Sequence, residues 1–251
     1  MVETTELYGG SIQLEFDSGR HTYRVINNGR RYKVPSVTSI CGIISKPALI
    51  PWAVNATIDV VRAAIGPGAE YSETYLEEVF RAAKQASGGI KKDAASRGTD
   101  VHRAIEAGLV GGTREGEICP QADAVIEWLR CTGSTVVETE RRIYSRRYRY
   151  SGTLDAIVEI DGRLVLLDWK TGGRYADHLM QTAAYQYAFE EETGQLIDRR
   201  ILVSLKDGLK PHPFPRSTYR RHLAGFLGAL RLFTNLKKAE KDLKDAARLL
   251  Q

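Results

Sequence analysis

The sequence has only three cysteines among its 251 residues, Cys41, Cys119 and Cys131. No two of them form a CxxC pair, and three cysteines cannot all pair with one another. The pattern argues against a disulfide framework, a zinc site and a four-cysteine iron–sulfur cluster. We therefore interpret the cysteines as reduced thiols of a cytoplasmic protein.

Long hydrophobic runs are also missing. The chain contains no apolar run of about 18 residues, the length at which a membrane-spanning helix is expected. The N-terminus, MVETTELYGG, is acidic and has neither the apolar segment of a signal peptide nor an Arg-rich amphipathic pattern. The sequence thus gives no support for membrane spanning, secretion or organelle import.

What the chain does contain is enough hydrophobic sequence for one sizeable core. Hydrophobic residues make up 43% of the composition and nothing marks a linker, so we expect a single domain over residues 1–251. The 36 Lys and Arg residues exceed the 31 Asp and Glu residues, which gives a formal net charge of +5. This moderate basic excess suits a polyanionic partner without proving one.

Hydrophobic periodicity predicts a mixed α/β fold. Alternation over residues 12–34 predicts a small antiparallel ribbon. Helices are predicted over residues 48–64, 71–86, 90–109, 119–130, 177–191 and from 218 to the end, with Trp52, Ile58, Tyr75, Val79 and Phe80 as inward positions. Strands are predicted over residues 135–144, 154–160, 163–167 and 199–205, with a right-handed crossover into the last one and a turn over residues 206–215.

The stretch from Ser151 to Thr171 organises the rest of the chain. Asp161-Gly162 separates two apolar runs and is a strong signal for a two-residue hairpin turn. Counting pairs back from this turn sets Asp155 directly opposite Asp168. Two carboxylates are therefore expected to meet across the ladder.

Two facing carboxylates need a compensating charge, because at about 5 Å they repel by about 3 kcal/mol if the effective dielectric constant is about 20. Lys170 stands on the same face as Asp168, two residues further on. The other face is apolar, so we expect the hairpin to be buried on one side. The arrangement is typical of a divalent cation site with oxygen ligands. The alternative is an edge hairpin whose acids are solvated and whose lysine pairs with one of them.

Two further patterns have a functional and a structural interpretation. Ser36, Thr38 and Ser39 begin a helix, where their hydroxyls form either a phosphate cradle or a plain N-cap; by themselves they favour the N-cap. The run RRIYSRRYRY, residues 141–150, interleaves arginines with tyrosines. It suits either binding of single-stranded nucleic acid or a solvated β-ribbon.

His102 lies beside the apolar stripe of its predicted helix. Glu106 follows four residues later, so the two side chains share one helix face. A lone histidine in such a place is more often a surface or core-edge residue than a metal ligand. The pattern alone therefore assigns it no role.

Four separated motifs, GTDVH at residues 98–102, GTLD at 152–155, DWKTG at 168–172 and QTAAY at 181–185, together resemble those of one nuclease family. This is the RecB-type branch of the PD-(D/E)xK nuclease superfamily. VPSVTSI at residues 34–40 and LKDGLKPHP at 205–213 are further similar to the mitochondrial genome maintenance exonucleases and their bacterial and phage relatives.

The resemblance implies a restriction-endonuclease-like core: a central mixed β-sheet flanked by helices, with an N-terminal ribbon and a helical insertion. Residues 1–90 would then form part of a DNA channel, and residues 91–251 the catalytic core and C-terminal helices. The chain lacks the transit peptide of the mitochondrial relatives, which points to a bacterial or phage protein. It also lacks the cysteine cluster of some RecB-type relatives, which points to no iron–sulfur centre.

The resemblance also implies roles for single residues. Asp155 and Asp168 would hold Mg²⁺ or Mn²⁺ with help from the backbone carbonyl of Trp169, and His102 would be a further ligand whose nitrogen favours Mn²⁺. Lys170 would orient or deprotonate the attacking water. A partly desolvated ammonium beside a cation is expected to have a lowered pKa.

Further residues would support the site or bind the substrate. Gln181 and Tyr185 would brace the site or contact the strand being cut, and Glu140 and Glu106 are weaker candidates beside the metal ligands. The expected nucleic-acid contacts are Ser36, Thr38, Ser39, Arg97, Arg103, Arg146, Arg147, Tyr185 and Lys206.

The implied function is metal-assisted hydrolysis of DNA by an exonuclease that prefers single strands or free ends, in recombination, repair or replication. An endonuclease of the same fold, cutting branched or specific DNA, is the second interpretation. A catalytically silent single-stranded-DNA-binding subunit is the third. We expect a monomer in the cytoplasm of a bacterium or phage-infected host, with no membrane contact, and leave a helicase or single-strand-binding partner open.

Overall fold

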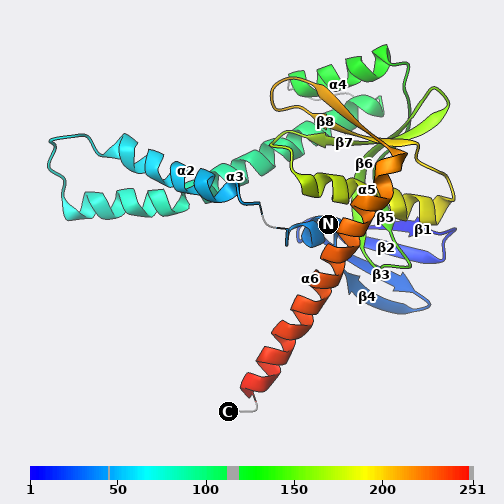
Figure 1. The fold of residues 1–251 in the computed structure, drawn as a ribbon, viewed down its shortest axis with the longest axis horizontal. Helices are drawn as coiled ribbons and strands as arrows, with labels where there is room; N and C mark the ends of the chain where they lie inside the picture. Colours follow the sequence, from blue (N-terminus) through cyan, green and yellow to red (C-terminus); the bar gives the residue numbers. More distant parts are fainter. Residues whose placement is uncertain (45, 112–118, 249–251) are drawn as a thin grey trace. The chain divides into compact units, whose positions relative to one another are not determined.

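The computed structural model describes residues 1–44, 46–111 and 119–248 (Figure 1). The chain divides into two compact units, one made of Met1–Ile44 and Ala104–Gln251 and the other of Ser45–Arg103. We call them the core unit and the helical unit. The N-terminal ribbon groups with the second half of the chain. The predicted division at residue 90, with a DNA channel formed in part by residues 1–90, stays a prediction. Whether the chain acts as one domain stays a prediction.

The core unit begins with a four-stranded antiparallel sheet. Its strands are β1 (Val2–Leu7), β2 (Ile12–Asp17), β3 (Thr22–Asn27) and β4 (Arg30–Val34), in that order. The ribbon predicted over residues 12–34 is confirmed as β2 to β4. β1 was missed because its sequence, VETTEL, has no apolar alternation.

A five-stranded mixed sheet forms the centre of the core unit. Its order is β5 (Thr135–Tyr144), β6 (Ser151–Ile160), β7 (Arg163–Lys170), β8 (Arg199–Ser204) and β9 (Lys210–Pro215). Only β7 and β8 pair in parallel, and α5 (Ala176–Thr193) connects them, as the predicted crossover requires. The predicted mixed α/β fold with a central mixed sheet is confirmed.

Helices α1 (Val37–Cys41), α5 and α6 (Tyr219–Arg248) share a hydrophobic core with this sheet. α5 and α6 run side by side (Figure 1). The edge of the Tyr150 ring packs on Phe226 of α6, with centroids 4.8 Å apart. The Tyr150 hydroxyl donates a hydrogen bond of 2.8 Å to the backbone carbonyl of Ala184 in α5, which ties α5 to the start of β6. The remaining elements of the unit are α4 (Pro120–Cys131), the 3₁₀ turn η1 (Arg216–Thr218) and the end of α3.

The β6–β7 hairpin has the predicted register. Ile160 pairs with Arg163, and the ladder continues to Ala156 and Leu167, the residues next to the two acids. The expectation that only one face is buried was wrong, since Ile157 and Leu166, on the face of the acids, are 0% exposed. The reason is that α1 and α5 cover this second face.

Strand β9 was not expected, because its sequence KPHPFP contains three prolines. They stand at every second position and pair with Val203, Ile201 and Arg199 of β8. Alternate residues of an edge strand turn their N–H groups away from the ladder, so prolines there remove no ladder donor. Lys210, His212 and Phe214 consequently share one face of the sheet.

The helical unit consists of α2 (Leu49–Ala64) and the larger part of α3 (Glu73–Leu109). The sequence predicted a break at Gly88-Gly89, and this was wrong: α3 is continuous over 37 residues. Each glycine costs about 1 kcal/mol relative to alanine, which long flanking helical segments can offset. None of the described helices is both long and apolar enough to cross a bilayer.

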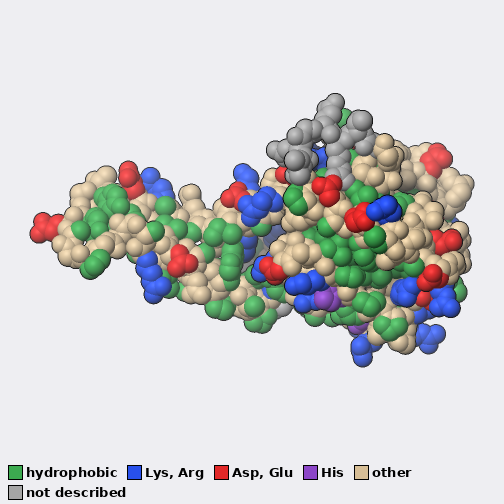
Figure 2. All heavy atoms as spheres, turned by 90° about the horizontal axis from the view of Figure 1, so that it is seen from above, with side chains coloured by type: hydrophobic (Ala, Val, Ile, Leu, Met, Phe, Trp, Pro, Cys, Tyr) green, Lys and Arg blue, Asp and Glu red, His purple; other side chains and the backbone are tan. Residues whose placement is uncertain are grey.

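Three positions of the helical unit that were expected inside are exposed. Ile58 and Tyr75 are each 39% exposed and Phe80 is 50% exposed, whereas Val79 is buried at 6%. Figure 2 shows hydrophobic side chains at the surface of these helices. So small a unit has few faces on which to bury apolar side chains, which explains the difference.

Candidate active site

Asp155, Asp168 and Lys170 meet at the end of the central hairpin. Asp168 is fully buried, and its Oδ2 lies 2.6 Å from the Nζ of Lys170. The Oδ2 of Asp155 accepts a hydrogen bond of 2.7 Å from the backbone N–H of Trp169. β6 therefore holds one carboxylate, and β7 the other carboxylate and the ammonium.

The two acids control the charge of Lys170. Burial by itself lowers the pKa of this ammonium, but Asp168 and Asp155 raise it by more, so the pKa lies above its ordinary value. The lowered pKa expected for Lys170 beside a bound cation stays a prediction. The raised pKa favours the charged ammonium of Lys170 beside Asp168.

Tyr185 and Gln181 of α5 stand beside the acids. The amide of Gln181 donates a hydrogen bond of 3.0 Å to the Tyr185 hydroxyl. Tyr185 is 2% exposed; burial raises the pKa of its hydroxyl well above the ordinary value, and Asp168 and Asp155 raise it further. This contact agrees with the predicted bracing role, although Tyr185 is also a core residue of the sheet.

Gly152 of the GTLD motif has a steric role that sequence reasoning missed. A Cβ at this position would lie 2.7 Å from Cε1 of Tyr185 and 3.4 Å from Cγ2 of Val37. Real Cβ atoms do not approach ring carbons so closely, so only glycine lets α5 pack directly on β6.

Glu140 is more prominent than the sequence suggested. A carboxylate oxygen of Glu140 lies within 4.8 Å of one from Asp155. Burial raises the pKa of Glu140 to about 8, with further contributions from Asp155 and Glu106. Its backbone has a φ of 45°, a left-handed conformation that costs a glutamate about 1 kcal/mol or more. The β5–β6 register shifts between Val136 and Glu138, just before this residue.

His102 and Glu106 lie one turn apart on α3, His102 in the helical unit and Glu106 in the core unit. Because α3 is one continuous helix, the predicted shared face is confirmed. Glu106 is close enough to Glu140 to raise its pKa. The role of His102 as a metal ligand stays a prediction.

The serine cluster behaves as an N-cap. Ser36 precedes α1, and its Oγ accepts a hydrogen bond of 3.0 Å from the backbone N–H of Ser39. The Ser36 hydroxyl also lies 3.1 Å from that of Thr38 and 2.7 Å from that of Ser39. These contacts agree with the capping alternative. Phosphate binding by the cluster stays a prediction.

The arginines of residues 141–150 have partners within the core unit. The Arg146 guanidinium lies 4.1 Å from the centre of the Tyr8 ring and donates a hydrogen bond to Ser11. Arg147 lies 5.5 Å from the ring centre of Tyr148. The contacts of Arg146 connect the segment after β5 to the turn between β1 and β2, and the contact of Arg147 is local. They give no support to DNA binding, which stays a prediction for both arginines.

The other predicted DNA contacts are exposed cations. Arg97 and Arg103 lie on α3 in the helical unit, where Arg103 forms an ion pair of 3.2 Å with Asp100. Lys206 follows β8 and lines a cavity on the core unit.

Residues 121–244 match the family described as the PD-(D/E)XK nuclease superfamily. This part of the chain belongs to that superfamily. The matched range contains Glu140, Asp155, Asp168, Lys170 and Tyr185, and it begins after His102. PD-(D/E)XK nucleases use divalent metal ions.

Mouse mitochondrial genome maintenance exonuclease 1 is 28% identical to this chain over 136 residues. The match covers 47% of this chain but only 39% of that protein, so it spans well under half of the relative's length.

Two crystal structures of LHK-Exo are also similar to this chain. This alkaline exonuclease comes from Laribacter hongkongensis, and one of its structures is a complex with dAMP. Both are 20% identical to this chain and match over 88% of their own length and over 63% and 60% of this chain, with TM-scores of 0.37 and 0.28.

The residues of this PD-(D/E)XK site fit a hard divalent cation. Glu140 and Asp155 crowd two carboxylates together, and Asp168 is a third, fully buried carboxylate. Burial and the neighbouring Asp155 raise the pKa of Glu140, as expected for carboxylates crowded together without a cation. Oxygen ligands of this kind are what Mg²⁺ and Mn²⁺ prefer.

Proposed function

We propose that the protein is a metal-dependent DNA exonuclease that acts on single strands or free ends. The observation that carries the proposal is the convergence of Asp155, Asp168 and Lys170 on two neighbouring strands, inside a PD-(D/E)XK nuclease domain. The context of recombination, repair or replication in a bacterium or phage belongs to the same proposal, as does a cytoplasmic monomer.

We assign the metal to the carboxylates of Asp155, Asp168 and Glu140, with the carbonyl of Trp169 as a further oxygen ligand. His102 is a further candidate ligand because the GTDVH motif resembles that of the nuclease family, and its imidazole would favour Mn²⁺. When bound, the cation would polarise a phosphoryl oxygen and lower the pKa of the attacking water.

The protein's own residues complete the chemistry. Lys170 keeps its proton beside Asp168, so it would orient the water and offset the negative charge that grows on the phosphate. Gln181 fixes the Tyr185 hydroxyl next to the acids, which keeps that side of the site rigid. Glu140 would release its proton when it becomes a ligand.

The test is digestion of oligonucleotides labelled at the 5′ or the 3′ end. With Mg²⁺ or Mn²⁺ we expect a ladder that starts at one end, no cleavage in EDTA, and no cleavage of circular single-stranded DNA. Lys170→Ala should lose cleavage, whereas Lys238→Ala, an exposed position on α6, should keep it.

Other outcomes would favour the alternatives. Nicking of the circle would favour an endonuclease, and a bandshift without products would favour a binding subunit. Comparison of single strands with blunt duplexes tests the proposed strand preference.

A further inference from the structure

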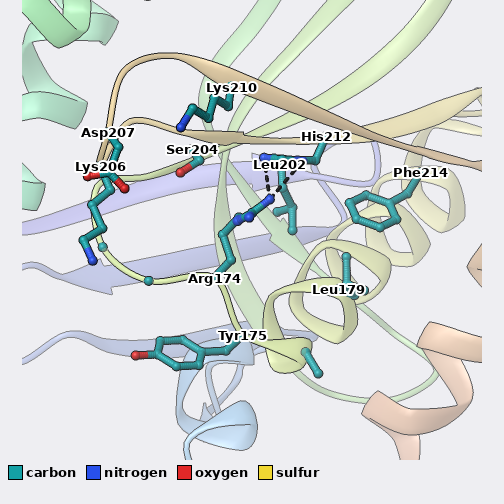
Figure 3. Close-up of a pocket in the computed structure, with 13 residues that line it drawn as sticks. Arg174, Tyr175, Leu179, Leu202, Ser204, Lys206, Asp207, Lys210, His212 and Phe214 are labelled. Atoms are coloured by element: carbon teal, nitrogen blue, oxygen red, sulfur yellow. Dashed lines mark hydrogen bonds between the residues drawn. The ribbon is translucent and has the colours of Figure 1, made fainter. Parts of the chain in front are cut away.

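A cavity of about 540 Å³ lies on the core unit beside the candidate active site (Figure 3). It is lined by the loop that follows β7, by the start of α5 and by β8 and β9. The LKDGLKPHP motif, residues 205–213, contributes one wall. Apart from Lys206, the residues of this wall have no role in the function proposed above.

The cavity is positively charged. Arg174, Lys206 and Lys210 line it, against a single acid, Asp207. In the part of the chain that the structure describes, neither lysine forms an ion pair with Asp207. The ammonium groups are therefore available to an anion.

His212 directs Arg174 without cancelling its charge. Figure 3 shows Arg174 reaching from the loop toward His212 on β9, and its Nη1 lies 2.9 Å from Nδ1 of the ring. Burial lowers the pKa of His212, and the positive charges of Arg174 and Lys210 lower it further. The lowered pKa favours the neutral imidazole, which can accept a hydrogen bond from the guanidinium.

The β-sheet register connects the cavity to the catalytic residues. Asp168 pairs with Leu202, which pairs with His212, and Lys170 pairs with Ser204, which pairs with Lys210. Residues paired across neighbouring strands point to the same face. The two rows therefore run from the catalytic acid and lysine into the cavity, over two strand spacings or roughly 10 Å.

The rest of the lining suits the organic part of a nucleotide. Leu179, Leu202 and Phe214 contribute apolar side chains to the lining. Binding cavities for small molecules have volumes of about 300–1,000 Å³ and combine apolar walls with a few polar groups. A phosphate alone would use only the cationic side of this cavity.

We propose that this cavity is a nucleotide subsite for the DNA strand, in which Arg174, Lys206 and Lys210 bind the phosphate of the nucleotide next to the bond that is cut. Phe214 and Leu202 lie along its sugar and base. The inference rests on the proposed nuclease function, because it assigns the cavity to the same strand.

The direct test is binding of a deoxynucleoside monophosphate in EDTA, measured by calorimetry, with the corresponding nucleoside and inorganic phosphate as comparisons. We expect the monophosphate to bind more tightly than either. Arg174→Ala and Lys210→Ala should each weaken its binding about tenfold, since each removes a charged hydrogen bond. Both positions are exposed, so the variants should fold, and Lys238→Ala is the matched control.

Equal affinity for nucleoside and monophosphate, or unchanged affinity in both variants, would overturn the assignment. Kinetics separate it from the proposed function: Lys210→Ala should raise KM for oligonucleotide digestion about tenfold with kcat little changed, whereas Lys170→Ala should lose kcat. If the parent cuts DNA and the cavity variants cut it equally well, the subsite is wrong and the nuclease stands. If the parent cuts no DNA but binds the monophosphate, and the variants lose this binding, the nucleotide site stands and the nuclease function is wrong.

Discussion

Replacement of Glu140 by glutamine should stabilise the protein in the absence of metal. Burial and the neighbouring acids raise the pKa of Glu140 to about 8 from an ordinary value of 4.5. Between these values the folded protein holds a proton that the unfolded chain has released, so stability falls as pH rises through this interval. At pH 7 the loss from this one group is about 3 kcal/mol, at 1.36 kcal/mol per pKa unit.

Because glutamine does not titrate, the substitution removes this pH-dependent loss of stability. We therefore expect Glu140→Gln to be more stable than the parent by up to about 3 kcal/mol at pH 7 in EDTA, and by little at pH 4. Urea unfolding at pH 4, 5.5, 7 and 8.5 measures the difference. Glu159→Gln, at an exposed position on β6, is the control and should show no such trend.

Bound metal should reverse the order of stability of the parent and Glu140→Gln. With saturating Mn²⁺ the parent should gain stability and Glu140→Gln should gain much less, because it has lost a ligand. A stability difference in EDTA that does not change with pH, or a variant less stable than the parent at pH 7, would refute the argument that Glu140 is a buried and electrostatically destabilised acid.

Three further predictions concern the same site. Gly152→Ala should lower the free energy of unfolding in urea by about 1–3 kcal/mol, because the new Cβ meets Tyr185. Gly88→Ala on α3, with open space around it, should instead raise the free energy of unfolding by up to about 1 kcal/mol. Equal effects of the two substitutions would contradict the steric argument. Asp168→Asn should cut oligonucleotides at least about a hundredfold more slowly with an unchanged circular dichroism spectrum, and near-parent activity would remove Asp168 from the site. Mn²⁺ affinity should rise with pH up to about 8, because Glu140 must lose its proton to bind the metal. Calorimetry in buffers of different ionisation enthalpy should detect the released proton. A pH-independent affinity would argue against Glu140 as a metal ligand.

The acids of the hairpin could be predicted because their geometry is local. A two-residue turn at Asp161-Gly162 determines the pairing of β6 and β7, and the period of two then decides which side chains share a face. Lys170 follows from the same count. None of these steps needs knowledge of the rest of the fold.

The prominence of Glu140 in the site could not be predicted from local sequence in the same way. Its position depends on a register shift in β5 and on a left-handed backbone conformation, and neither has a signal in the run around it. β9 was missed for a related reason, since prolines are compatible with a strand only when the neighbouring strand lies on the side away from their nitrogens. Both features are decided by a partner strand distant in sequence.

The sequence by itself determined most of the helices and strands and the register of the β6–β7 hairpin, and hence the expectation that Asp155 and Asp168 share one face, because turn chemistry and side-chain alternation act over a few residues. The tertiary structure decided which further groups surround those acids: Glu140 from a distorted strand, Tyr185 packed on Gly152, and the cationic cavity built by β8 and β9. Charge repulsion, burial and steric fit act between atoms that only folding brings together, so neither periodicity nor composition contains them.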